Sequence, residues 1–184
     1  MKNKERDGEF LKSESFDLLN PKRWENARHF IKNLCMLPEV VRDGFANMIG
    51  IVIVTHGNLG EEMMNSAAMI LGETAKTVFS VSVSSVSAKI EEMRDNLLSV
   101  IDEAEEGQGA VVCTDLFGGT PSNLSISILG IRNVEVIAGV NLPMLLKLLT
   151  LREQCPSLDL KDVCVLAEEA GKKQISIASN LIKK

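Results

Sequence analysis

A histidine stands where a strand-like run ends. The run over 48–55 is almost wholly apolar, and His56 and Gly57 follow it directly. A continuous Ile/Val run is typical of a parallel strand buried on both faces, and open α/β sheets carry out their chemistry at the carboxyl ends of such strands. The second histidine, His29, lies outside the region that we expect to fold as a domain. His56 is therefore the candidate for histidine chemistry.

A second segment, Thr114 to Asn123, follows another apolar run and opens a helical pattern. Gly118 and Gly119 allow the backbone to turn sharply. We expect Thr120 to be the N-cap of the helix, with Pro121 in its first turn. Backbone N–H groups at such a helix start attract anions of phosphate size, so the segment is a candidate phosphoryl-binding turn.

Asp115 follows the strand-like run 110–114, so we expect it at the same sheet edge as His56. A neutral imidazole can attack phosphorus through one nitrogen while a carboxylate holds the other N–H and stabilises the developing imidazolium. With backbone donors of Gly118, Gly119 and Thr120 around the phosphoryl oxygens, the pair would form a phosphohistidine site without metal or cofactor. Each feature also has a structural interpretation: a hydrogen-bonded histidine, a simple turn and a capping aspartate.

Charge and composition exclude several classes of protein. The formal net charge of −5 disfavours non-specific nucleic-acid binding, and 4% aromatic residues without tyrosine argue against a base-stacking surface. The four cysteines have no metal-site spacing. No run approaches the roughly 18 apolar residues that span a bilayer. The charged start leads into no hydrophobic segment, so we expect a cytoplasmic protein without a signal peptide or direct membrane insertion.

Strand and helix patterns alternate from Met48 onward. Strands are predicted over 48–55, 77–83, 110–114 and 134–138, and helices over 59–72, 86–105, 120–130, 142–151 and 158–170, the last ending at Gly171. This alternation predicts a three-layer α/β/α fold with a central, mainly parallel sheet. A final alternating segment, 174–179, predicts a C-terminal edge strand that can add to a neighbouring subunit.

Residues 1–47 differ from the remainder, since they are dense in both charges and hold the only tryptophan, Trp24. Helical spacing of apolar residues runs from Trp24 to Leu37, before Pro38. We predict an N-terminal extension over 1–47, partly helical or flexible, and one domain over 48–184. The extension is a docking helix, a partner-binding element or a flexible tail, or it precedes a true translation start at Met48.

Three sequence blocks resemble the IIA component, mannose family, of the bacterial phosphoenolpyruvate-dependent sugar phosphotransferase system. They are Ile51–Gly57, Thr114–Asn123 and Val136–Met144, in family order and at family-like spacing. The resemblance covers residues 48–179. It does not cover residues 1–47, and we expect no IIB domain to follow.

The resemblance implies that His56 is phosphorylated, that Asp115 supports it, and that Gly118, Gly119 and Thr120 line the phosphoryl site. It also implies strand order 2-1-3-4 and a homodimer whose last strand pairs with the partner's sheet. The donor would be the phosphocarrier HPr and the acceptor a separate IIB-type protein in sugar uptake. Alternatively, the protein is a regulator whose phosphorylation state controls a partner, a component serving dihydroxyacetone kinase, or a non-catalytic binding module.

Overall fold

The computed structural model describes residues 48–72, 78–83 and 89–181. The predicted extension over 1–47, with its helix, lies outside the described residues, as do the starts of the second predicted strand and helix. Residues 175–181 belong to a different compact unit from residues 48–174 and are described by themselves.

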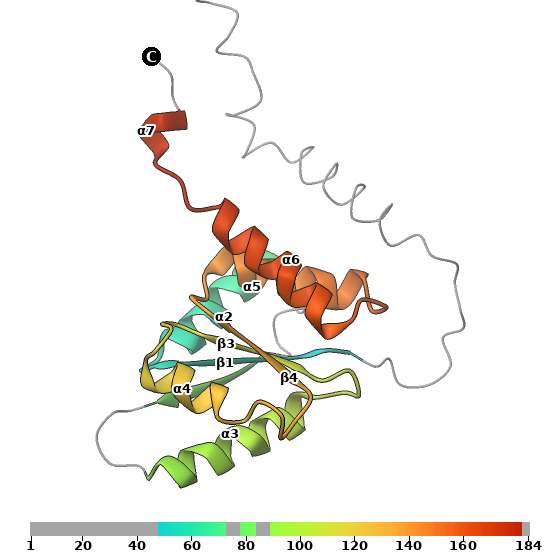
Figure 1. The fold of residues 1–184 in the computed structure, drawn as a ribbon. Helices are drawn as coiled ribbons and strands as arrows, with labels where there is room; N and C mark the ends of the chain where they lie inside the picture. Colours follow the sequence, from blue (N-terminus) through green and yellow to red (C-terminus); the bar gives the residue numbers. More distant parts are fainter. Residues whose placement is uncertain (1–47, 73–77, 84–88, 182–184) are drawn as a thin grey trace, which may run out of the picture. The chain divides into compact units, whose positions relative to one another are not determined.

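The central sheet has four parallel strands in the order β2-β1-β3-β4 (Figure 1). The strands are β1 (Gly50–His56), β2 (Phe79–Val83), β3 (Ala110–Thr114) and β4 (Val134–Ala138). All of β3 and all of β1 except its last residue are buried, because these two strands occupy the middle of the sheet and have helices on both faces. The predicted parallel sheet and its strand order are confirmed.

Helices cover both faces of the sheet, which confirms the predicted three layers. They are α2 (Leu59–Leu71), α3 (Ile90–Ala104), α4 (Thr120–Ile126), α5 (Leu142–Gln154) and α6 (Leu160–Lys173). Figure 1 shows α3 and α4 on one face, and α2, α5 and α6 on the other. Within the described ranges, no helix has the length and apolarity needed to cross a membrane.

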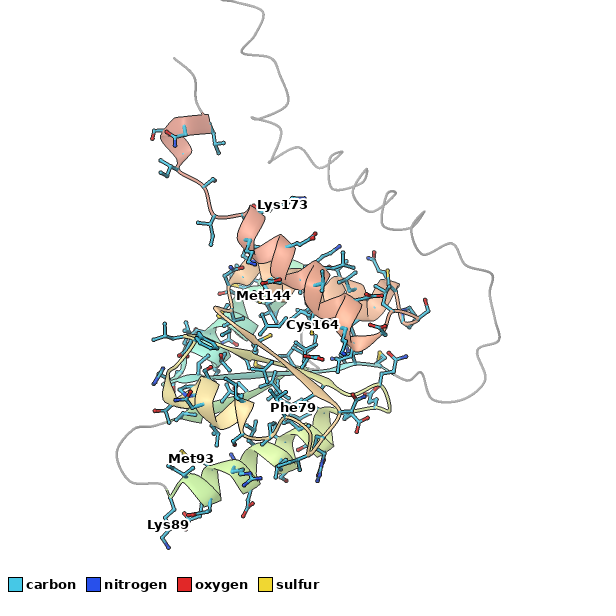
Figure 2. All side chains as sticks on the ribbon, viewed as in Figure 1. Phe79, Lys89, Met93, Met144, Cys164 and Lys173 are labelled. Carbon is cyan, nitrogen blue, oxygen red and sulfur yellow. The ribbon has the colours of Figure 1, made fainter. Side chains whose placement is uncertain are left out.

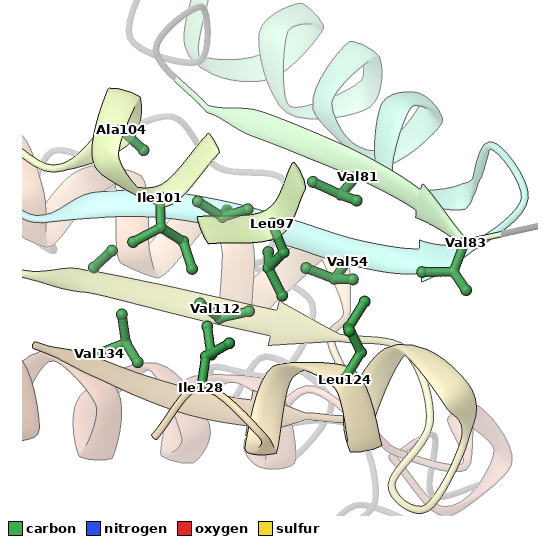
Figure 3. Close-up of a cluster of buried hydrophobic side chains, with 12 residues drawn as sticks. Val54, Val81, Val83, Leu97, Ile101, Ala104, Val112, Leu124, Ile128 and Val134 are labelled. Atoms are coloured by element: carbon green, nitrogen blue, oxygen red, sulfur yellow. The ribbon is translucent and has the colours of Figure 1, made fainter. Parts of the chain in front are cut away.

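Aliphatic side chains fill the layer between the sheet and α3 and α4 (Figure 3). Leu97 and Ile101, four residues apart on α3, point at Val54 and Val112 of the two central strands. Each fully buried side chain of this kind contributes about 1.5–3 kcal/mol through loss of apolar surface from water. Figure 2 shows charged side chains such as Lys89 in solvent instead, where 76% of its side chain is exposed.

Helix α4 is shorter than predicted and ends at Ile126 rather than near residue 130. Beyond it the chain makes tighter i→i+3 hydrogen bonds, from Ile128 N to Ser125 O and from Leu129 N to Ile126 O. Such bonds close an α-helix by tightening its last turn.

Helix α6 continues through Gly171 to Lys173, so the prediction that Gly171 ends it is wrong. The glycine is required by packing instead. A Cβ there would lie 3.0 Å from Met144 Cε and 3.1 Å from Asn141 Nδ2. Gly171 therefore allows α6 to approach the start of α5 closely.

The predicted strand over 174–179 is not formed in the single chain. Gln174 caps α6, and Ala178–Leu181 (α7) forms a short helical turn. Ile175 and Ile177 are 78% and 67% exposed. A strand needs a neighbouring strand for its backbone hydrogen bonds, and the described residues provide none for this segment. That a partner subunit provides one remains a prediction.

Candidate active site

His56 is the last residue of β1 and lies at the carboxyl edge of the sheet. Its main chain pairs with Val83 of β2. Because side chains alternate along a strand, the imidazole lies on the same face as Val54, which is the α4 face. The side chain is 46% exposed. A rigid buried strand thus presents the imidazole at the surface.

The structure brings Asp115, the residue after β3, directly against His56. Asp115 Oδ2 accepts the main-chain N–H of His56 at 2.8 Å and lies 2.9 Å from the ring Nδ1. Its Oδ1 accepts the N–H of Leu116 at 2.7 Å. An ionised carboxylate only accepts hydrogen bonds, so Nδ1 carries the proton and Nε2 keeps its lone pair in the neutral ring.

The ionisation of Asp115 depends on these contacts. Desolvation raises the pKa of the carboxyl, whose side chain is only 12% exposed. Hydrogen bonds from the His56 main chain, the His56 ring and the Leu116 N–H outweigh this effect and bring the pKa below its usual value. Asp115 is therefore a carboxylate at neutral pH and can stabilise positive charge on the imidazole.

The turn before α4 packs against the imidazole. A Cβ at Gly119 would lie 3.0 Å from His56 Cε1 and 3.7 Å from Nε2. At Gly118 the space is open, but its φ of +82° disfavours any other residue. Gly119 thus leaves room for the imidazole, and Gly118 adopts the backbone conformation that the turn requires.

The N-cap of α4 is Gly119, and the prediction that Thr120 caps it is wrong. Gly119 has the extended conformation of a cap, and its carbonyl accepts the N–H of Asn123 at 2.9 Å. Thr120 is the first helical residue and is exposed. Gly119 N–H donates to Leu116 O, which leaves the N–H groups of Gly118 and Thr120 without a partner in the described part of the chain.

Two hydroxyls next to His56 were missed by sequence reasoning. Ser82 Oγ of β2 donates to Gly57 O at 2.8 Å, and Thr55 Oγ1 accepts the N–H of Gly60 at 2.9 Å. Both fix the turn from β1 into α2. The only signal in the sequence was the alternation of serine and valine in β2, which placed Ser82 on a polar face without showing its partner.

The third sequence block, Val136–Met144, stabilises the end of the strand that carries Asp115. The N–H groups of Gly139 and Val140 both donate to Thr114 O at 2.9 Å. The side chain of Asn141 accepts the N–H of Met144 at 3.0 Å and so caps α5. These bonds fix the end of β3, from which Asp115 projects.

Neither a metal cluster nor a reactive thiol accompanies the site in the described ranges. No three His, Cys, Asp or Glu side chains there are grouped to hold a metal ion. Cys113 and Cys164 are free. Burial raises the pKa of Cys164 to about 12 and that of Cys113 further still, so both are protonated and poor nucleophiles at neutral pH.

Comparison with known proteins decides the family. Residues 50–163 match the family model described as PTS system fructose IIA component, where PTS is the phosphotransferase system. The chain belongs to this family. The predicted resemblance is thereby confirmed.

Individual relatives agree with the family match. The mannose-specific EIIAB component of Escherichia coli K12 is 33% identical over 128 residues, which are 69% of this chain but only 38% of that protein. The fructose-specific EIIA component of Bacillus subtilis 168 is 28% identical over 139 residues, covering 74% and 91% of the two chains. A mannose/sorbose-specific IIA subunit from Enterococcus faecalis has the same fold, with TM-score 0.61, 25% identity and coverage of 71% and 94%.

Proposed function

We propose that this IIA protein is a phosphocarrier in which His56 accepts a phosphoryl group from phospho-HPr and passes it to a IIB-type acceptor for sugar uptake. The observation that carries the proposal is the 2.9 Å contact between His56 Nδ1 and Asp115 Oδ2. It leaves Nε2 as the nucleophile, in an exposed ring, without metal or cofactor. Membership in the family supports the phosphotransferase system as the setting of this transfer.

The transfer balances without any further reactant. Nε2 of neutral His56 attacks phosphorus, a new N–P bond forms, and the N–P bond of the donor breaks. The donor imidazole leaves as a neutral ring, while the ring of His56 keeps its Nδ1 proton and becomes cationic. Asp115 stabilises that cation and prevents rotation of the ring. Transfer to the acceptor reverses these steps.

The turn beside the ring would bind the phosphoryl oxygens. The N–H groups of Gly118 and Thr120 have no partner in the described part of the chain, and Gly119 brings the backbone against the imidazole. We propose that these main-chain donors orient the phosphoryl group.

The surface around His56 suits a protein as donor and acceptor. Leu116 and Phe117 are 63% and 76% exposed in the same turn. The two segments that carry the site, 48–72 and 110–131, contain no lysine or arginine. A partner with an apolar contact area and basic residues would therefore complement this surface.

We also propose that the protein is a cytoplasmic homodimer. The exposed Ile175 and Ile177 alternate with small residues and would pair with a second copy's sheet. Changing both to serine should lower the molar mass in light scattering from that of two chains to that of one. A dimer in the variant would show that this segment does not hold the copies together.

Reconstitution tests the proposed relay. Purified protein, enzyme I, HPr and radiolabelled phosphoenolpyruvate should give an acid-labile phosphoprotein, and omission of HPr should abolish labelling. His56→Ala should take no label. Undiminished labelling of that variant would refute the role of His56.

A chase separates transport from regulation. Addition of a IIB-type protein from the same organism should remove the label and transfer it to the IIB-type protein. Label that stays on this chain, together with a partner that binds only one phosphorylation state, would instead favour the regulatory alternative.

A further inference from the structure

The turn that follows His56 is fixed on the β2 side by a serine hydroxyl. Ser82 Oγ donates to Gly57 O at 2.8 Å. Ser82 is the penultimate residue of β2 and pairs with Thr55, the residue before His56. Its neighbours Val81 and Val83 are buried on the opposite face, so the strand fixes the direction of the hydroxyl.

Two other hydrogen bonds hold this turn, from Gly60 N–H to Thr55 Oγ1 and from Glu62 N–H to Asn58 O, but neither involves Gly57. Gly57 has a φ of +53°, and the space around its missing Cβ is empty. A glycine in this conformation rotates more freely than other residues. On the other side of the imidazole, Asp115 holds the main-chain N–H of His56. The two bonds thus hold the main chain at the N–H of His56 and at the carbonyl of the next residue, Gly57.

We propose that Ser82 is a positioning residue for phosphoryl transfer, because its hydroxyl holds the carbonyl of Gly57, the residue after His56, and thereby keeps Nε2 directed at the incoming phosphorus. The proposal rests on the proposed phosphorylation of His56. A hydroxyl that only stabilised the fold would leave the geometry of the ring unchanged, and the experiment below separates these roles.

The strand offers matched variants. Ser82→Thr and Ser82→Val have nearly the same shape, but only threonine keeps the hydroxyl. Ser80 is the control, since it is exposed on the same face of β2 and lines, together with Ser82, a water-sized cleft of about 20 Å³. Its hydroxyl makes no hydrogen bond in the described part of the chain. Each variant is measured by rapid quench with phospho-HPr.

Ser82→Val and Ser82→Ala should lower the first-order rate of transfer by about three- to tenfold, the effect of one hydrogen bond on the barrier, with an unchanged KM for phospho-HPr. Ser82→Thr and Ser80→Ala should transfer at the wild-type rate. Equal rates in Ser82→Val and Ser82→Thr would overturn the proposal. A Ser82→Val variant that raises the KM for phospho-HPr but keeps the wild-type first-order rate would also overturn it.

NMR of the unphosphorylated protein provides a readout that does not depend on transfer. The Cε1–H resonance of His56 should shift in Ser82→Val and remain in place in Ser82→Thr and Ser80→Ala. An unchanged Cε1–H resonance in Ser82→Val would refute the claim that the Ser82 hydroxyl positions the imidazole of His56. If His56→Ala still accepts label, the proposed function fails, while this comparison still tests Ser82.

Discussion

Substitution of Asp115 by asparagine removes the charge beside the imidazole that we propose accepts the phosphoryl group, and it retains the shape of the side chain. The carboxylate accepts three hydrogen bonds, two from His56 on Oδ2 and one from Leu116 on Oδ1. Asparagine has one oxygen and one NH₂ group. In either orientation, its NH₂ group faces an N–H donor, so the variant loses at least one bond.

The magnitude follows from the bond to the ring. Hydrogen bonds to a charged group contribute about 1.5–3 kcal/mol, and neutral ones about 0.5–1.5 kcal/mol. The imidazole becomes cationic only as the N–P bond forms, so the difference of about 1–2 kcal/mol raises the barrier rather than weakening partner binding. Transfer should slow by about 5- to 30-fold, with an unchanged KM for phospho-HPr.

A rapid-quench experiment with radiolabelled phospho-HPr measures this rate in a single turnover. Asp159→Asn is a matched control, because Asp159 also accepts a main-chain N–H, that of Asp162, as the N-cap of α6, and asparagine is an equally good cap. Wild-type transfer by Asp115→Asn would refute electrostatic support of His56. An equal loss in Asp159→Asn would show a general effect of the substitution.

Three further predictions concern the same edge of the sheet. Because hydrogen bonds lower the pKa of Asp115, its ionised form stabilises the fold above about pH 4, and this contribution is lost at lower pH. The difference in unfolding free energy between wild type and Asp115→Asn, measured by urea titration, should therefore shrink below that pH. Gly119→Ala should slow transfer by about tenfold or more, because its Cβ would meet the imidazole. Gly118→Ala should instead lower the melting temperature, because alanine disfavours a φ of +82°. Slower transfer only in Gly118→Ala and a lower melting temperature only in Gly119→Ala would contradict this geometry. Phe117→Ser should raise the KM for phospho-HPr without changing the first-order rate, and Val165→Ser, an exposed apolar control on α6, should change neither.

Periodicity in the sequence predicted the parts of the fold in which burial dominates. The Ile/Val runs of β1 and β3 are buried on both faces, so their pattern allowed few alternatives. The end of β1 then placed His56 and the end of β3 placed Asp115 at one edge, because parallel strands bring their carboxyl ends to the same edge of a sheet. That β1 and β3 are neighbours, which brings the two residues together, was implied by the family resemblance, and neither signal predicted the 2.8 and 2.9 Å contacts.

The errors occurred where backbone packing overrides residue preference. Gly171 resembles a helix terminator, but it lies inside α6, where a Cβ would come within 3.0 Å of Met144 Cε and 3.1 Å of Asn141 Nδ2. Thr120 resembles an N-cap, but Gly119 has that position, and it also lies against the imidazole of His56. Such close approaches depend on elements distant in the sequence, as does the Ser82 contact, and no local pattern reports them.

The most direct test of the account is to locate the phosphoryl group in the protein phosphorylated by HPr. Phosphorus and nitrogen NMR on chain labelled at its histidines distinguishes the two ring nitrogens, and peptide mapping under alkaline conditions identifies the residue. The account predicts a single phosphoryl group on Nε2 of His56, with Nδ1 still protonated beside Asp115. A phosphoryl group on Nδ1, on another residue, or no phosphorylation at all would contradict it.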